Sequence, residues 1–82
     1  MLRRASDAAD AAKERELGNA AYTKKDFETA LTHYQIAADL EPTNMVYLNN
    51  MAAAYFGLKK FSECVDTCKK ALEVGKQNRL TF

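Results

Sequence analysis

Several residue types are scarce in this 82-residue chain, which has no tryptophan, one proline, three glycines and two cysteines. The shortage of proline and glycine favours helices, because both residues interrupt them. No apolar run approaches the ~18 residues that a membrane-spanning helix needs, so no membrane span is expected. The net charge of +1 provides none of the basic excess that is typical of nucleic-acid-binding proteins. The length allows one small domain.

The first residues and the cysteines bear on the cellular compartment. The basic segment MLRRAS is followed by Asp7 and Asp10 instead of an apolar stretch, which excludes a secretory signal peptide. Cys64 and Cys68 are four residues apart, where a disulfide would have poor geometry and only His33 could join them on a metal ion. We therefore expect no metal and no other cofactor. The cysteines are interpreted as two small core thiols in a reducing compartment, the cytoplasm.

Two stretches have the apolar spacing of an amphipathic helix, and they lie 34 residues apart. Each stretch follows another apolar segment of helical spacing, which predicts two pairs of helices. The stripe of the first stretch consists of Phe27, Ala30, Leu31, Tyr34, Ala37 and Ala38, and that of the second consists of Phe61, Cys64, Val65, Cys68, Ala71 and Leu72.

Turn and cap residues divide these helices. Pro42 disfavours helix at the residue before it and so ends the second helix. Thr43 or Asn44 can then cap the third helix, and Asp26 can cap the second. The segments 24–26 and 58–60 are the short turns inside the two pairs. The sequence therefore predicts helix-turn-helix twice, an all-α fold with a period of 34 residues.

The period and its residues resemble the tetratricopeptide repeat (TPR) family. The matching positions are Leu17, Gly18, Ala20, Tyr22, Phe27, Ala30, Tyr34, Ala37 and Pro42 in the first repeat, and Met51, Ala52, Ala54, Tyr55, Phe61, Ala71 and Leu72 in the second. The resemblance implies that two repeats, or four helices, stack as an α-solenoid. Small residues such as Gly18 would let paired helices approach, and Phe27, Tyr34 and Phe61 would fill the gaps between helices.

The resemblance also implies a division of the chain. Residues 1–10 would be an N-terminal extension, 11–44 the first repeat, 45–78 the second repeat, and 79–82 the start of a missing third repeat. Lys76 stands where the repeat usually has its closing proline. The last helix is therefore expected to continue through Glu73 towards Asn78.

The stretch RELGNAAY puts Arg15 and Asn19 four residues apart, on one face of a helix. Together with MVYLNNMAAAYF it is similar to the middle TPR domain of the chaperone-organising co-chaperones (Hop). That domain holds the C-terminal Met-Glu-Glu-Val-Asp of heat-shock protein 90 in a carboxylate clamp. The resemblance implies that the peptide-binding residues here are Arg15, Asn19, Tyr22, Asn50 and Phe56. Arg15 replaces the usual lysine, and Gly57 stands where a polar side chain would be expected.

The family completes its clamp with a lysine and an arginine from a third repeat. We therefore expect a truncated piece of a longer co-chaperone that carries half a clamp. Val65 and Leu72 would be exposed at its open end, through which a homodimer could form. The tail of the seventy-kilodalton heat-shock chaperone, which also ends in Glu-Glu-Val-Asp, is a second candidate ligand.

Other functions are weighed against this one. The sequence offers no Ser-His-Asp or Cys-His arrangement, so the chain is not expected to be an enzyme, and His33 is expected on an exposed face of the second helix. One alternative is a generic TPR interaction or self-associating scaffold that binds no tail. Another is an accessory domain attached to an enzyme.

Overall fold

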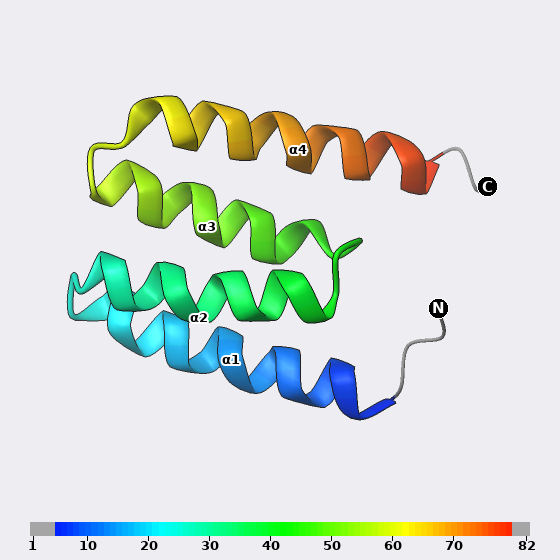
Figure 1. Ribbon diagram of the computed structural model, residues 1–82, viewed down its shortest axis with the longest axis horizontal. Helices are drawn as coiled ribbons and strands as arrows, with labels where there is room; N and C mark the ends of the chain where they lie inside the picture. Colours follow the sequence, from blue (N-terminus) through cyan, green and yellow to red (C-terminus); the bar gives the residue numbers. More distant parts are fainter. Residues whose placement is uncertain (1–4, 80–82) are drawn as a thin grey trace.

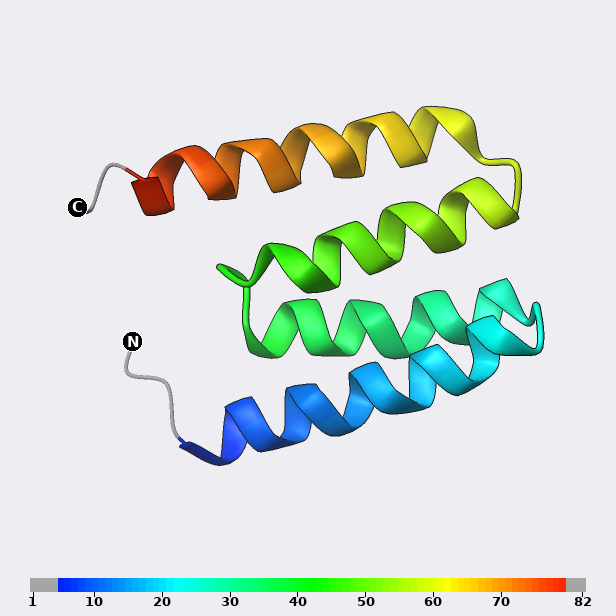
Figure 2. The same cartoon turned by 180° about the vertical axis from the view of Figure 1, so that it is seen from behind.

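The computed structural model of the protein describes the backbone of residues 5–79 and the side chains of residues 7–76. This part of the chain forms four helices, α1 (Ala5–Thr23), α2 (Phe27–Leu40), α3 (Met45–Gly57) and α4 (Phe61–Arg79). They lie side by side in chain order, each antiparallel to the next, with α1 and α4 at the two ends of the row (Figure 1). The view from behind shows the same order (Figure 2). The predicted all-α architecture of four helices is confirmed.

Polar side chains cap α2 and α3 at their starts. The carboxylate of Asp26 accepts a hydrogen bond from the backbone N–H of Thr29 at 3.3 Å. The side-chain oxygen of Asn44 accepts one from the N–H of Val46 at 3.0 Å. Both satisfy backbone donors that the first turn of a helix leaves unpaired. Both predicted capping positions are therefore confirmed, with Asn44 rather than Thr43 at the start of α3.

The turn between α1 and α2 has the same backbone geometry as the turn between α3 and α4. Lys25 and Lys59 both adopt a left-handed conformation, with φ angles of 64° and 62°. In each turn the N–H of the following residue bonds to the carbonyl five residues earlier, at 2.9 Å. This is the Schellman pattern of helix ends. The two lysines are 34 residues apart, so the backbone repeats with the period of the sequence.

The two end helices are the longest, with 19 residues each. α1 begins at Ala5, within the segment expected to be an extension, and α4 runs to Arg79 as the missing proline predicts. Neither these nor the other helices of residues 5–79 are long and apolar enough to cross a membrane. In the same part of the chain, no three His, Cys, Asp or Glu side chains are grouped so that they could hold a metal ion.

Close packing between helices depends on glycine at two points. A Cβ atom on Gly18 would lie 2.6 Å from Cε1 of Tyr34, whose side chain is 2% exposed. A Cβ on Gly57 would lie 2.7 Å from the ring of Phe27, which fills the space of the polar side chain expected there. Around these contacts the core consists of Ala11, Ala21, Ala30, Tyr34, Ala37, Ala38, Tyr47, Met51 and Ala54.

Three expectations about individual side chains are wrong. Cys68 is exposed and Cys64 is half-buried, so these free cysteines are not both core thiols. Phe61 does not fill a gap between helices, because it is 53% exposed. His33 is half-buried, and its Nδ1 lies 2.7 Å from Oε1 of Glu14 on α1. The exposure of each of these side chains depends on which neighbouring helix covers it. The periodicity within one helix does not contain that information.

Candidate peptide-binding face

Three of the predicted site residues lie along one face of α1. Arg15, Asn19 and Tyr22 fall within an arc of about 60° at 100° per residue. Asn19 and Tyr22 are exposed, and Arg15 is half-buried. The ring of Tyr22 meets the ring of Phe27 edge to face, with centroids 5.3 Å apart. This contact holds Tyr22 beside the turn that leads into α2.

The side chain of Asn19 is held by a residue of α2. The hydroxyl of Tyr34 donates a hydrogen bond to Oδ1 of Asn19 at 2.6 Å. The amide oxygen of Asn19 is therefore engaged towards the core, and the amide NH₂ is the part that remains for other acceptors. Asn19 is thus presented on this face as a hydrogen-bond donor.

Arg15 lies where α1 approaches α3. Burial raises the pKa of Tyr47 on α3, as does its hydrogen bond to Glu41, whereas the positive charge of Arg15 lowers it. The Tyr47 hydroxyl donates to Oε1 of Glu41 at 3.1 Å. The Nε–H of Arg15 is buried and has no hydrogen-bond partner within the described residues. An unpaired buried donor costs about 1–3 kcal/mol, so the burial of this N–H is unfavourable.

The other two predicted residues lie on α3 and do not share a face. Asn50 follows Tyr47 by three residues, about 60° around the helix, and so lies beside the residue that Arg15 approaches. Phe56 is about 120° away from Asn50 around α3. It is 64% exposed, and its ring meets that of Phe61 on α4 with centroids 5.6 Å apart. The structure thus places Phe56 towards α4, apart from the polar residues.

Sequence reasoning missed the two tyrosines behind this face. The apolar stripe assigns Tyr34 to the core and says nothing about its hydroxyl. A buried tyrosine hydroxyl usually has a hydrogen-bond partner. From this rule the sequence could have predicted that Tyr34 and Tyr47 each bond to a polar group. The spacing within a single helix could not identify Asn19 as the partner of Tyr34, because the two lie on different helices.

These tyrosines predict a loss of stability in alkaline solution. Burial, followed by the effect of Tyr22, raises the pKa of Tyr34 above its usual value, and burial raises that of Tyr47. Above a pH of about 10, the unfolded chain therefore loses phenolic protons that the folded chain keeps. The free energy of unfolding should fall as pH rises through this range. Urea denaturation at pH 9 and pH 11 should show the fall, and Tyr34→Phe should make it smaller. An equal fall in the variant would contradict this assignment.

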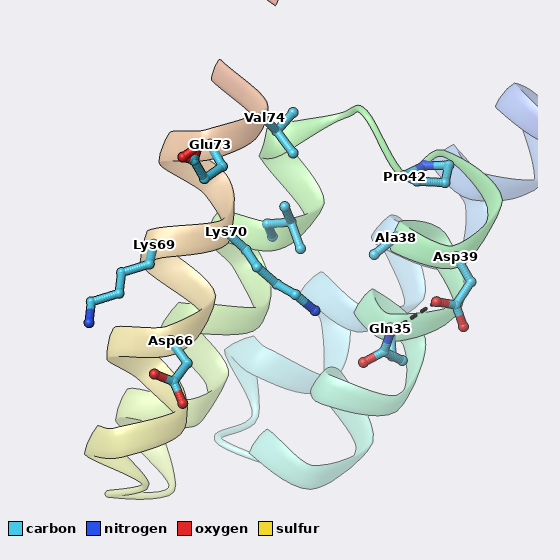
Figure 3. Close-up of a pocket in the computed structure, with 10 residues that line it drawn as sticks. Gln35, Ala38, Asp39, Pro42, Asp66, Lys69, Lys70, Glu73 and Val74 are labelled. Carbon is cyan, nitrogen blue, oxygen red and sulfur yellow. Dashed lines mark hydrogen bonds between the residues drawn. The ribbon is translucent and has the colours of Figure 1, made fainter. Parts of the chain in front are cut away.

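A cleft of about 500 Å³ lies between α2 and α4 (Figure 3). Its lining includes Leu48 of α3, which is about 160° from Asn50 around that helix. The cleft and the polar residues are therefore on different faces. Side chains of both charge signs line it, with Lys70 directed across towards Gln35 (Figure 3). The lining residues are Gln35, Ala38, Asp39, Pro42, Leu48, Asp66, Lys69, Lys70, Glu73 and Val74.

The polar face on α1 and α3 has the chemistry to hold an anion. Asn19 and Asn50 can supply amide N–H donors without adding charge. Arg15 adds a positive charge and a planar fork that can hold both oxygens of a carboxylate. A peptide carboxylate offers about four acceptor positions, which several such donors can share. This arrangement suits recognition of an acidic group.

No protein-family model matches the chain, but it is similar to several known proteins. Stress-induced-phosphoprotein 1 of Caenorhabditis elegans is 54% identical over 69 residues, which are 84% of this chain and 22% of that protein. The Hsp70-Hsp90 organizing protein of Triticum aestivum is 49% identical over 74 residues, 90% of this chain and 13% of that protein. The chain therefore spans less than a quarter of the length of these relatives.

A solved structure has the same fold. The N-terminal domain of stress-induced protein-1 (STI-1) from C. elegans matches with a TM-score of 0.86 and 50% identity, over 93% of this chain and 60% of that one. The four helices, the 34-residue period and these similarities agree with one another. The chain is a pair of tetratricopeptide repeats, and its homologues are the Hsp70-Hsp90 organizing and stress-induced-phosphoprotein co-chaperones.

Proposed function

We propose that this chain is a co-chaperone peptide-binding module that recognises the C-terminal Met-Glu-Glu-Val-Asp tail of heat-shock protein 90. Arg15, Asn19 and Asn50 would act as a partial carboxylate clamp for the terminal carboxylate. Tyr22 would contact the peptide beside the clamp, and Phe56 would contact only peptide residues that extend towards α4. The role is binding, without catalysis and without a cofactor.

One observation carries the proposal. Along one face of α1, the guanidinium of Arg15 has donors and no acceptor, and the amide oxygen of Asn19 is already engaged by Tyr34. Both groups can therefore only donate to a ligand on this face. A ligand that accepts hydrogen bonds and carries negative charge satisfies both requirements, and the terminal carboxylate of a peptide is such a ligand.

The relatives' names point to two candidate chaperones. The wheat relative is named for organizing Hsp70 and Hsp90. The resemblance of residues 13–56 to a middle TPR domain favours the heat-shock protein 90 tail over the seventy-kilodalton one. A cytoplasmic location belongs to the same proposal, because Cys64 and Cys68 are free thiols, which reducing compartments preserve.

A competition experiment tests the choice of tail. Fluorescence anisotropy of labelled Met-Glu-Glu-Val-Asp would be followed while unlabelled Met-Glu-Glu-Val-Asp, Glu-Glu-Val-Asp or the reversed sequence Asp-Val-Glu-Glu-Met is added. Three or four hydrogen bonds with a net value near 4 kcal/mol correspond to a Kd on the order of 1 mM. We expect the pentapeptide to compete best and the reversed peptide to compete poorly. Equal competition by the first two would count against a preference for heat-shock protein 90, and equal competition by all three against the clamp.

A second candidate function is self-association. Phe61, Val65 and Leu72 form an exposed apolar stripe on α4, with exposures of 53%, 51% and 65%. Exposed apolar patches of this kind are typical of interaction surfaces. If the chain were a self-associating scaffold, sedimentation would show a dimer as concentration rises, and Val65→Glu would return it to one chain mass. One chain mass at all concentrations would exclude this function.

A further inference from the structure

Tyr34 has a polar contact that its place in the core does not require. Its side chain is 2% exposed, yet its hydroxyl reaches Oδ1 of Asn19 on the neighbouring helix at 2.6 Å. A phenylalanine would fill the same space with the same ring. The hydroxyl therefore contributes the hydrogen bond to Asn19, whereas the ring alone provides the packing.

We infer that Tyr34 is a positioning residue that decides which end of the Asn19 amide faces a ligand. This inference rests on the proposed function. An asparagine amide can present either its oxygen or its NH₂ group, and only the NH₂ group can bond to a carboxylate. By donating to Oδ1, Tyr34 fixes the NH₂ group as the end available for a ligand.

The direction of this hydrogen bond follows from the burial of the hydroxyl. If the amide were turned round, the hydroxyl oxygen would accept from the Asn19 NH₂ group, and the hydroxyl proton would need another acceptor. Within the described residues, Asn19 is the hydrogen-bond partner of this hydroxyl. A buried O–H without an acceptor is unfavourable. The arrangement in which Tyr34 donates is therefore the one that leaves no buried proton unpaired.

Gly18 makes the contact possible from the α1 side. It lies directly before Asn19, and a Cβ at this position would lie 2.6 Å from Cε1 and 2.7 Å from Cδ1 of the Tyr34 ring. The absent side chain lets the ring lie against the backbone of α1. The hydroxyl then reaches the side chain of the next residue. Gly18, Asn19 and Tyr34 act together as one structural unit.

The second repeat gives an internal comparison. With the 34-residue period, the positions of Gly18, Asn19 and Tyr34 correspond to Ala52, Ala53 and Cys68. None of the three residue types recurs, although the backbone turns of the two repeats match. The helical hairpin therefore forms without a glycine or a tyrosine at these positions. Where the asparagine is absent, the tyrosine that holds it is absent too, as a positioning role predicts.

A double-mutant cycle tests the inference. The Kd of the free-acid Met-Glu-Glu-Val-Asp peptide would be measured for the unmodified chain, Tyr34→Phe, Asn19→Ala and the double variant. We expect Tyr34→Phe to weaken binding about three- to tenfold, the range for one lost hydrogen bond. In the Asn19→Ala background the same change should have no further effect, because the two residues act through one contact. Tyr55→Phe, which removes a half-buried hydroxyl elsewhere, is the matched control and should leave Kd unchanged.

The outcomes separate the inference from the proposed function. If the chain binds the peptide but Tyr34→Phe changes Kd by the same factor in the unmodified chain and in Asn19→Ala, the positioning role alone is overturned. An unchanged Kd for Tyr34→Phe would have the same meaning. If the unmodified chain does not bind the peptide at all, the proposed function fails and the inference fails with it.

Discussion

Replacing Arg15 with alanine is expected to weaken binding of the Met-Glu-Glu-Val-Asp peptide roughly ten- to a hundredfold. A hydrogen bond to a charged group contributes about 1.5–3 kcal/mol, and Arg15 brings the positive charge on this face of α1. Isothermal titration calorimetry or anisotropy would measure the change. Arg15→Lys should keep part of the affinity, because it retains the charge but loses the planar fork.

Lys13→Ala is the matched control for this prediction. Lys13 is exposed on the same helix but lies about 160° around it from Arg15. The Lys13→Ala variant therefore removes one positive charge, as Arg15→Ala does, but leaves the proposed clamp unchanged. If Lys13→Ala and Arg15→Ala weaken binding equally, the peptide is attracted by the overall charge and not held by Arg15. That result would contradict the assignment of Arg15 to the site.

Replacing Gly18 with alanine is expected to destabilise the fold by about 1–3 kcal/mol, the usual range for overpacking a close contact. The added Cβ would lie 2.6 Å from the buried ring of Tyr34, so the ring or α1 must move. Urea denaturation would measure the loss. Replacing a glycine inside a helix with alanine normally stabilises a protein, so a loss of stability here would be due to the contact with Tyr34.

Gly75→Ala provides the contrast on α4. A Cβ there would lie 3.5 Å from the sulfur of Met45, an ordinary contact. This variant should gain about 0.5–1 kcal/mol from the better helix propensity of alanine. The two glycine variants should thus shift stability in opposite directions. If Gly18→Ala also stabilised the protein, the ring of Tyr34 would not be tightly held against α1.

The sequence predicted the fold well because the fold is periodic. The 34-residue spacing, the caps at Asp26 and Asn44 and the end of α2 before Pro42 are each determined by residues close together in the chain. The contacts between helices were not predictable in this way. Neither the bond from Tyr34 to Asn19 nor the pairing of His33 with Glu14 has a local signal, because each joins residues 15 or 19 positions apart.

The predicted site was only partly determined by the sequence, for a related reason. Helical spacing placed Arg15 and Asn19 on one face of α1, and in the structure Tyr22 lies along the same face. It did not reveal that Phe56 turns towards Phe61 and away from Asn50, since that depends on how α4 packs beside α3. The buried Nε–H of Arg15 likewise became apparent only once the helices were in place.

The most direct test of the proposed function is an NMR titration with Met-Glu-Glu-Val-Asp, as the free acid and as the C-terminal amide. The side-chain NH₂ resonances of Asn19 and Asn50 would be followed. The proposal predicts that both shift with the free acid and that the shifts are lost with the amide, because the carboxylate is the group that these donors hold. Unshifted Asn19 and Asn50 resonances at millimolar peptide, or equal shifts with both peptides, would contradict recognition of a terminal carboxylate by this face.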